Sequence, residues 1–517
     1  MASAHSRLQP TDKRVPSSQA WSELFLWQVD RSTETPLFRQ IYGEIRAAVL
    51  DHRLPPGTRL PSTRALADRL GVSRTAAVSA YEQLLAEGYL VGRVGAGTYV
   101  SDDLPAALVQ RPQRRRHVQT VHPIQISDRA QMSDAFVRAY PKADALPFAR
   151  GRCIMDERSV AAWRRLTHRA LRSFSAVHLG YSDPLGLPEL RSAICEYLRS
   201  ARAVHCDPDQ IVVTAGTQYA IDIALRVLLR PGDAAWIEDP HYSLTYQALR
   251  SAGVRAWPIP VDRQGLNVAE GVRTAPQARA VFVTPSHQHP LGVVMSMGRR
   301  LELLAWARGA GAWIVEDDCD GEFRYAGRPL AALQGLDDAE RVIYVGTFNK
   351  VLFPGLRMGY AVVPRSLLDA FVGARFLMDR HAPTLDQTVL AAFLNEGHFA
   401  GHIRRTRLIY KEARDTLVGE LTGQLGARLE TDAPEQGMHL VAYLKGRGSD
   451  TAIERQARAR GVVVRALSPL YLGAHPRQGL VLGFTGFPQT DIRVAVEQLG
   501  LVLAVRPTDA RRTASRI

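Results

Sequence analysis

Lysine, cysteine and long apolar runs are all scarce in this 517-residue chain. Only five of its 65 basic residues are lysines, namely Lys13, Lys142, Lys350, Lys411 and Lys445. The four cysteines lack metal-ligand spacing and are too few for a disulfide framework, so we expect no metal site and a reducing compartment. No run approaches the roughly 18–20 apolar residues of a membrane span, and the polar N-terminus lacks the apolar core of a secretory signal. These absences predict a cytoplasmic protein without membrane contact.

Positive charge is abundant but unevenly placed. The formal net charge of +14 suggests a polyanionic partner, although charge alone is weak evidence. Residues 1–100 carry twelve Lys or Arg against nine Asp or Glu. The arginine-rich stretch at 111–116 and the arginines after 510 are equally typical of a solvated linker and tail.

The chain is too long for one ordinary core, so several domains are expected. Composition predicts a flexible arm over 1–30, a compact unit over 31–101, a proline-containing linker over 102–145, a large domain over 146–507 and a basic tail over 508–517. In the large domain, helical segments alternate with short Val/Ile-rich runs. That alternation predicts an α/β fold with a mostly parallel sheet and a smaller C-terminal subdomain.

The compact unit has the pattern of a winged helix-turn-helix. Apolar residues recur every four positions over 36–50, and a second helix over 62–70 stops at Gly71. Ser73 can cap a third helix, and two strands over 89–91 and 98–100 enclose a glycine-rich wing. A small helical interaction domain is the alternative on periodicity alone.

The chemistry of this unit suits DNA. Arg74 and Thr75 begin the third helix, where side chains can meet phosphates and base edges, and Arg64 begins the second. The stretch LPSTRALADRLGVSRTAAVSAYEQLLAEGYLVGRVGAGTYV resembles the winged helix-turn-helix of GntR-type bacterial transcription regulators. The resemblance implies DNA contacts by Arg64, Arg74, Thr75 and the wing near Gly95. Val78 stands where some relatives have a further arginine.

Five polar segments each follow a predicted strand of the large domain. These strands span 211–214, 234–238, 279–283, 312–315 and 342–345. Because ligands bind beyond the carboxyl ends of strands in open α/β sheets, we expect the five segments to converge on one cleft.

Lys350 follows the last of these strands. Burial at a strand end should lower its pKa toward that of a nucleophilic amine, as a Schiff base with an aldehyde cofactor requires. A solvated surface lysine is the alternative for any single lysine.

The neighbouring segments offer complementary groups. Gly216 and Thr217 open a helix whose N–H groups would face an anion, and Thr347 and Arg357 would bind the same phosphate. Asp317 ends a buried strand, where a protonated pyridine nitrogen would be a suitable partner. Tyr242 could stack on such a ring. Each residue alone is ordinary; the order and spacing of the set predict a site.

The set resembles the fold-type I aminotransferases, which bind pyridoxal 5′-phosphate. The motifs GYSDPLGLPELRSAI, VTAGTQYAID, TPSHQHPLG, EDDCDGEFRY and GTFNKVLFPGLRMGY carry the resemblance. It implies that Lys350 forms the Schiff base, Asp317 pairs with the pyridinium and Tyr242 stacks. It also implies a phosphate cup of Gly216, Thr217, Thr347 and Arg357, with His289 near the cofactor. A GntR-type head before such a domain looks like the MocR subfamily of regulators, which implies a homodimer, with domain exchange as a hypothesis.

Three positions depart from the aminotransferase pattern. Cys319 stands where the family places a tyrosine on the cofactor's 3′-oxygen, and His289 replaces the asparagine of N-P-x-G. Val481 replaces the arginine that clamps a substrate carboxylate, with Arg465 as one candidate substitute. These changes argue against ordinary transamination and leave cofactor binding largely intact.

We therefore predict a regulator that binds promoter DNA and senses an amine, an amino acid or pyridoxal phosphate itself through an internal aldimine at Lys350. One alternative is a working aminotransferase that retains a DNA-binding head. Another is a regulator whose large domain no longer binds the cofactor. The sequence identifies neither the effector nor the operator.

Overall fold

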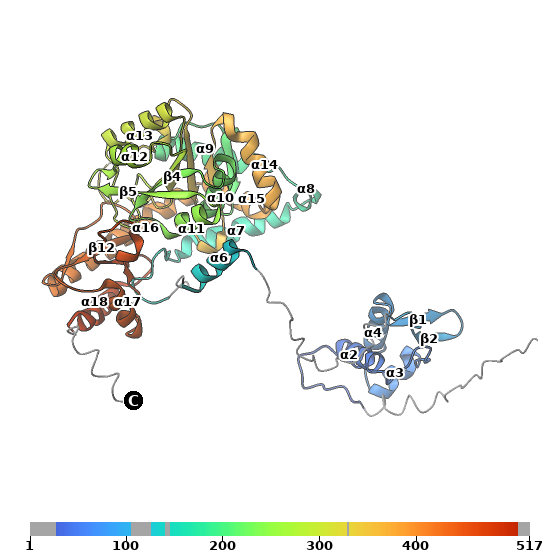
Figure 1. The fold of residues 1–517 in the computed structure, drawn as a ribbon. Coiled ribbons are helices and arrows are strands. Elements are labelled where there is room, and N and C mark those ends of the chain that lie inside the picture. The colour runs from blue at the N-terminus through green and yellow to red at the C-terminus, as the bar shows by residue number, and fades with distance from the viewer. Residues whose placement is uncertain (1–26, 105–125, 140–144, 328–329, 505–517) are drawn as a thin grey trace, which may run out of the picture. The chain divides into compact units, whose positions relative to one another are not determined.

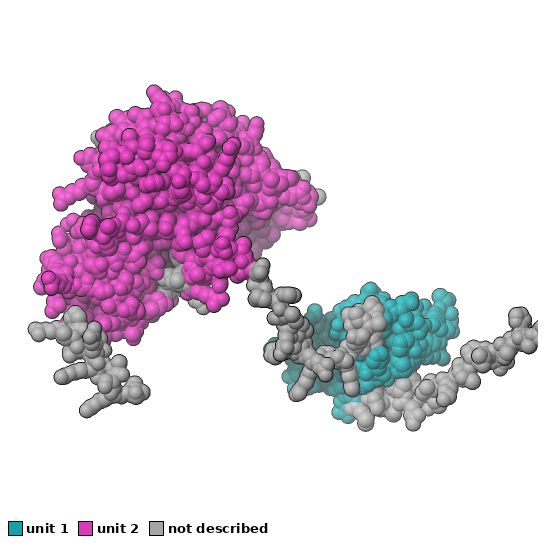
Figure 2. Space-filling model, viewed as in Figure 1, with its two compact units in different colours: residues 1–125 teal, residues 126–517 magenta. Residues whose placement is uncertain are grey.

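The computed structural model describes residues 27–104, 126–139, 145–327 and 330–504. The chain divides into two compact units, residues 1–125 and 126–517 (Figure 1; Figure 2). Most of the predicted arm, 1–30, and the whole predicted tail, 508–517, lie outside the described residues. The exact domain limits 31–101 and 146–507 stay predictions. No described helix is long and apolar enough to cross a membrane.

The N-terminal unit is a winged helix-turn-helix. It contains α2 (Leu37–Leu50), α3 (Thr63–Leu70) and α4 (Arg74–Ala86), followed by antiparallel strands β1 (Leu90–Arg93) and β2 (Gly97–Val100). The side chains of Ser62 and Ser73 cap α3 and α4, each accepting a backbone N–H at 3.2 Å. Gly71 ends α3 in the left-handed region, at φ +62°. The wing strands are longer than predicted, because Gly92 pairs with Thr98 within the ladder.

A helix lies inside the predicted linker. α6 spans Asp128–Ala139 and packs on α11 (Ser243–Ser251), where Arg250 Nη2 lies 3.3 Å from Met132 Sδ. The prolines that indicated a linker, Pro105, Pro112 and Pro123, all precede the helix and so do not interrupt it. The prediction of a plain linker over 102–145 is therefore wrong for this segment.

An eight-stranded mixed sheet forms the centre of the large unit. Its strands are β3 (Ile211–Thr214), β4 (Ala234–Asp239), β5 (Arg255–Asp262), β6 (Gly265–Leu266), β7 (Ala280–Val283), β8 (Trp313–Asp318), β9 (Val342–Thr347) and β10 (Gly359–Val362). They lie in the order β3-β10-β9-β8-β7-β4-β5-β6. β5, β4, β7, β8 and β9 are parallel, whereas β10 runs antiparallel to both of its neighbours. The mostly parallel sheet that we predicted is confirmed.

Helices cover both faces of this sheet (Figure 1). Helices α10, α11 and α14 bury their apolar residues against one face. Helices α9, α12, α13 and α15 pack against the other. Besides α6 and α11, the helices around this sheet are α7 (Glu157–Arg172), α8 (Ala176–Leu179), α9 (Pro188–Arg202), α10 (Thr217–Leu228), α12 (Val268–Thr274), α13 (Met297–Ala310), α14 (Leu368–Asp379) and α15 (Thr384–Asn395). Short 3₁₀ turns are η1 (Pro208–Gln210), η2 (Gln334–Leu336), η3 (Pro354–Leu356), η4 (Arg365–Leu367) and η5 (Ser468–Leu470).

The C-terminal part adds a smaller four-stranded antiparallel sheet. Its strands, β11 (Leu429–Thr431), β12 (His439–Leu444), β13 (Arg465–Ala466) and β14 (Gly479–Gly483), lie in the order β11-β12-β14-β13. The helices of this part are α16 (His398–Leu425), α17 (Asp450–Ala459) and α18 (Gln489–Ala504). On one face of the sheet Leu480 and Leu482 join the main core, and on the other Val441 and Val481 pack near Leu291 of the large sheet's loops.

Candidate cofactor site and DNA-contact surface

Lys350, Cys319 and Tyr242 come together although they follow three different strands. Lys350 Nζ donates to Cys319 Sγ at 3.1 Å and lies 5.6 Å from the centre of the Tyr242 ring. Cys319 directly follows β8, Tyr242 precedes α11 and Lys350 follows β9. The carboxyl ends of these strands therefore meet at one place, as expected for ligand sites in open α/β sheets.

The pKa expected for Lys350 is wrong. Burial alone would lower the pKa of its ammonium group, but Cys319, Tyr242, Asp320 and Asp317 together outweigh burial and raise the pKa well above its usual range. Burial also raises the pKa of the Cys319 thiol well above its usual range, although Lys350 opposes the shift. Without a cofactor, Lys350 is thus an ammonium ion that must lose a proton before it can act as a nucleophile.

Asp317 is a buried carboxyl group with an unsatisfied oxygen. Successive side chains of β8 point to opposite faces, and Asp318 pairs with Arg202 while accepting the Tyr344 hydroxyl at 2.7 Å. Asp317 Oδ1 has no hydrogen-bond partner among the described residues. Burial raises the Asp317 pKa from 3.8 to about 7, although Lys350 opposes the shift. Asp317 and Tyr242 line the same small cavity, so a ring that lies against Tyr242 and bears an N–H would satisfy this oxygen.

The predicted phosphate ligands also lie together. Gly216 precedes α10 at φ +116°, and a Cβ atom there would lie 2.6 Å from Asn349 Nδ2 and 3.9 Å from Arg357 Nη2. Thr347 is buried at the end of β9, where its hydroxyl accepts the Asn349 N–H at 3.1 Å. Thr217 begins α10, so its N–H belongs to the free first turn of that helix. The arrangement fits a phosphate group at a helix N-terminus.

Asn349 is a residue that the sequence analysis missed. Its Oδ1 accepts the Met358 N–H at 2.8 Å, which ties the segment after β9 to the segment that holds Arg357. Its position directly before Lys350 was the available signal, but an asparagine in a loop has no distinctive pattern.

His289 is placed against Tyr242 and is held by Arg150. The two rings are T-shaped with centres 5.0 Å apart, and Arg150 Nη1 lies 2.5 Å from His289 Nε2. A guanidinium can only donate, so Nε2 must accept and the proton must lie on Nδ1. Burial and the charge of Arg150 lower the His289 pKa well below its usual range, so the ring is neutral. Its Nδ1 is buried without a hydrogen-bond partner among the described residues, which makes it a donor available to a ligand.

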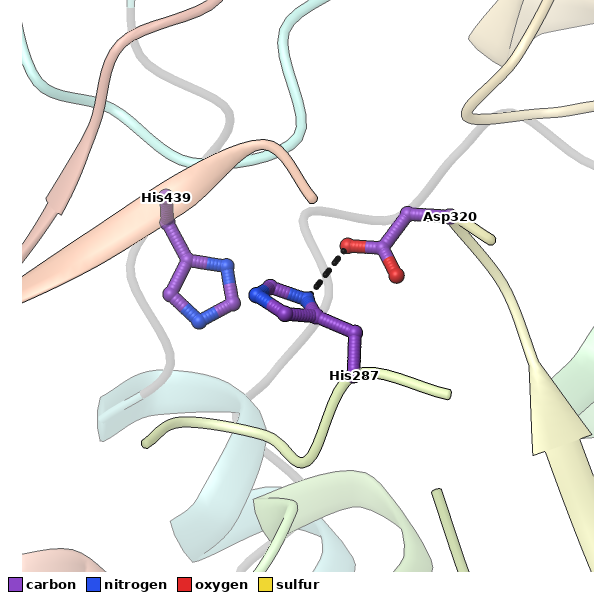
Figure 3. Close-up of side chains that lie close together, drawn as sticks. All are labelled: His287, Asp320 and His439. Carbon is purple, nitrogen blue, oxygen red and sulfur yellow. Dashed lines mark hydrogen bonds and ion pairs between the residues drawn. The ribbon is translucent and has the colours of Figure 1, made fainter. Parts of the chain in front are cut away.

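The side chains of His287, Asp320 and His439 form a cluster that joins the two sheets (Figure 3). His287 Nδ1 lies 3.1 Å from Asp320 Oδ2, and His439 on β12 lies with Nε2 3.0 Å from the Pro290 carbonyl oxygen. Although burial alone would raise it, His287 holds the Asp320 pKa at about 2. The three side chains could in principle hold a metal ion. Yet a Cβ atom on Gly437 would lie 2.5 Å from His287 Nε2, so the ring is already enclosed. Hydrogen bonds account for His287 Nδ1 and His439 Nε2, whereas His287 Nε2 has no partner among the described residues.

Val481 offers no cation to a carboxylate. It lies in β14 within an apolar cluster that includes Val441, Leu467 and Leu470. Arg465, the substitute considered from the sequence, is its partner in β13, and its Nη1 lies 3.8 Å from Glu454 Oε1 on α17.

The predicted DNA contacts are all exposed on the N-terminal unit. Arg64 lies in the first turn of α3, Arg74 and Thr75 begin α4, and Gly95 occupies the tip of the wing at φ +73°. Val78 is half-buried. Exposure is what contact with DNA requires, and the individual contacts stay predictions.

Comparisons with known proteins agree with both units. Residues 37–100 match "Bacterial regulatory proteins, gntR family", and residues 146–499 match "Aminotransferase class I and II". The chain is 40% identical to the "Probable rhizopine catabolism regulatory protein MocR" of Rhizobium meliloti, over 91% of this chain and 94% of that protein. The chain belongs to the MocR subfamily of GntR-type regulators.

Further relatives of this MocR-subfamily chain include regulators and enzymes. It is 30% identical to the "HTH-type pyridoxine biosynthesis transcriptional regulator PdxR" of Corynebacterium glutamicum, over 90% of this chain and 95% of that one. The solved kynurenine aminotransferase of Pyrococcus horikoshii has a TM-score of 0.64 and 26% identity, covering 73% of this chain and 95% of that chain. The likenesses confirm the predicted fold and imply pyridoxal 5′-phosphate as the cofactor.

Proposed function

We propose that this MocR-subfamily regulator binds promoter DNA with its winged helix-turn-helix and senses a small molecule through pyridoxal 5′-phosphate held at Lys350. The observation that carries the proposal is Asp317, a buried carboxyl group with an unsatisfied oxygen, in the same pocket as Tyr242. A buried polar atom without a partner is costly unless a ligand satisfies it. The pyridine N–H of the cofactor would do so.

The residues of the chain divide the work of holding the cofactor. When bound, pyridoxal phosphate supplies an electrophilic carbon that captures primary amines. Lys350 is the proposed attachment point, and Tyr242 would lie against the ring. Gly216, Thr217, Thr347 and Arg357 would bind the phosphate through backbone N–H groups, hydroxyls and a guanidinium.

The N–H of His289 would replace the tyrosine hydroxyl that the family places on the cofactor's 3′-oxygen, at the position of Cys319. Cys319 cannot donate as a tyrosine hydroxyl does, because a thiol is a weak donor and Lys350 already donates to it. The His289 Nδ1–H is buried without a partner among the described residues, and the His289 ring makes a T-shaped contact with Tyr242. We therefore assign this N–H to an oxygen of the cofactor or effector.

Sensing requires the effector to favour one of two states of the regulator. An amine that takes the place of Lys350 on the cofactor would release Lys350 as a charged ammonium group. Attachment of the cofactor to Lys350 would instead remove that ammonium charge. Either event changes charge beside Asp317 and could bias DNA binding. We also propose that the protein is cytoplasmic and acts as a homodimer, with domain exchange between subunits, because dimers read the repeated half-sites of operators.

An absorbance titration of full-length protein with pyridoxal phosphate tests the proposal. We expect a visible band from lysine-bound cofactor in the wild type and none in Lys350→Ala. Lys411→Ala is the matched control, because Lys411 is an exposed lysine that pairs with Asp415 on α16. A wild type without the band would overturn the proposal.

Turnover of amino donors separates the regulator from an aminotransferase. We expect the protein to react with amines no faster than free pyridoxal phosphate does, while an effector changes its affinity for DNA. Turnover well above that of the free cofactor would favour the alternative, an active aminotransferase with a DNA-binding head.

A further inference from the structure

We infer that the effector is an amine that also carries a carboxylate, and that Arg150 binds this carboxylate where relatives use an arginine at the position of Val481. The inference rests on the proposed function, because the amine would be recognised beside the cofactor at Lys350. It assigns a specificity-determining role to a residue outside every motif considered in the sequence.

The backbone of Arg150 is fixed against the strand that contains Val481. Gly483 of β14 donates its N–H to the Phe148 carbonyl oxygen at 2.9 Å. A Cβ atom on Gly483 would lie 2.5 Å from the Ala149 carbonyl oxygen and 3.0 Å from Arg150 Cα. The segment before α7 therefore crosses β14 in close contact, two residues from Val481. Arg150 thus approaches the site from the part of the fold where relatives carry the carboxylate-binding arginine.

The guanidinium of Arg150 reaches the cofactor site through His289. Arg150 Nη1 contacts His289, whose ring makes a T-shaped contact with Tyr242 at 5.0 Å between centres. The same Tyr242 ring lies 5.6 Å from Lys350 Nζ. Tyr242 therefore lies between Lys350 and the His289 ring that Arg150 contacts.

The charges of this region suit a carboxylate. Burial, Arg150 and the neighbouring histidines keep His289 neutral, and burial with His287 lowers the His439 pKa to about 3. Positive charge beside His289 therefore comes from Arg150 and Lys350, and not from the rings of His289 and His439. One guanidinium can hold a neutral imidazole with one N–H and a carboxylate with two others. The buried His289 Nδ1–H adds a donor that has no partner among the described residues.

Arg465 is the rival candidate, and its surroundings differ. It lies on the short edge strand β13, directly opposite Val481, and its guanidinium is 3.8 Å from Glu454. The guanidinium of Arg465 is thus directed to an acidic group on α17, whereas Arg150 contacts His289 directly. The two arginines can be separated by experiment.

Matched amines test the inference on full-length protein loaded with pyridoxal phosphate. The pairs are glycine and methylamine, β-alanine and ethylamine, and 4-aminobutyrate and propylamine, whose members differ only by the carboxylate. The readouts are the cofactor's absorbance change and the affinity for DNA next to the protein's own gene. In at least one pair we expect the carboxylated amine to act at about 10- to 100-fold lower concentration, the range for hydrogen bonds to a charged group.

Substitutions assign this preference to a residue. Arg150→Gln should remove most of the preference, and Arg150→Lys should keep part of it because charge remains without the planar fork. Arg465→Gln should leave the preference unchanged. The preference is the ratio of the effective concentrations of two amines on the same variant. General damage to the site, which affects both amines alike, therefore cancels from this ratio.

The outcomes distinguish this inference from the proposed function. Equal responses to both members of every pair in wild type, or a preference that survives Arg150→Gln, would overturn the role of Arg150. A preference abolished by Arg465→Gln alone would transfer the role to Arg465. If the wild type shows no cofactor band at all, the proposed function and this inference fail together.

Discussion

The two ends of the candidate site are built in different ways. The phosphate end comprises Gly216, Thr217, Thr347, Asn349 and Arg357, which belong to or adjoin the strands β3, β9 and β10. The effector end comprises Arg150, His289, Cys319 and Val481, from four segments that are distant in sequence.

At the phosphate end, contacts run mainly between backbone and short side chains, such as the Asn349 N–H on Thr347 and the Met358 N–H on Asn349. At the effector end, single side chains determine the chemistry, and three of the four positions depart from the aminotransferase pattern. The difference indicates that the fold keeps the cofactor while a few side chains change what reacts with it. Changes at each end should therefore alter different properties.

The largest effect is expected at the centre of the site, from Asp317→Asn. The amide cannot stabilise a pyridinium, so affinity for pyridoxal phosphate should fall by about 100-fold or more, as for a lost charge-assisted hydrogen bond in a buried site. Equilibrium binding measured by absorbance would show this loss. Unchanged affinity would contradict the assigned role of Asp317.

The same substitution should have the opposite effect on stability. Folding raises the Asp317 pKa from 3.8 to about 7, so its contribution to folding of the cofactor-free protein is full below 3.8 and is lost as the pH rises through about 7. Asp317→Asn should therefore increase the free energy of unfolding by roughly 1–3 kcal/mol at pH 8 and much less at pH 5. Denaturant unfolding of the cofactor-free protein at the two pH values measures the difference.

The next largest effect is expected from Arg357→Gln, which sharpens the distinction between the two ends. It should weaken binding of pyridoxal phosphate by about 10- to 100-fold, because it removes a charge-assisted contact with phosphate. Binding of pyridoxal, which has no phosphate, should change little and serves as the control ligand. Equal losses for both ligands would show that Arg357 supports the whole site, not its phosphate end.

A smaller effect is expected from Gly216→Ala. Its φ of +116° is unfavourable for alanine, and the new Cβ atom would lie 2.6 Å from Asn349 Nδ2. We expect the free energy of unfolding to fall by about 1–3 kcal/mol, with weaker cofactor binding. Gly309→Ala in α13, where a Cβ atom meets nothing within 4 Å, should instead stabilise the protein by about 0.5–1 kcal/mol. A Gly216→Ala protein as stable as wild type would remove the argument for a tightly packed phosphate end.

The smallest effect on the cofactor site is expected from Arg74→Ala on α4, which lies in the DNA-binding unit. It should weaken DNA binding by roughly tenfold, as loss of a base or phosphate contact does, while cofactor affinity stays unchanged. Arg39→Ala, an exposed arginine on α2, is the matched control and should have little effect on DNA binding. Fluorescence anisotropy with labelled promoter DNA at fixed salt compares the two variants.

The sequence was informative where a function depends on local backbone structure. Capped helices around Gly71, and a strand followed by Gly-Thr before α10, are short-range features that a chain segment specifies by itself. The ends of β3, β4 and β7 could therefore be predicted to within about one residue, whereas β8 and β9 continue beyond the predicted 315 and 345 to Asp318 and Thr347. Fold-level rules for parallel strands then placed the polar residues that follow these strands at one edge.

The rest depends on contacts between segments far apart. Arg150 meets His289 across 139 positions, and no local pattern specifies that contact. The pKa of Lys350 was predicted in the wrong direction because Cys319, Tyr242, Asp320 and Asp317 surround this lysine only in the folded chain. Helix α6 was missed because the prolines before it dominated the composition of the stretch.

The most direct test is the affinity of the protein for DNA beside its own gene, measured with and without pyridoxal phosphate and amine, in wild type and Lys350→Ala. We predict that wild-type affinity changes when cofactor or amine is added, and that the Lys350→Ala protein binds DNA but does not respond. A Lys350→Ala protein that responds as wild type does would contradict the claim that this lysine couples the cofactor to DNA binding.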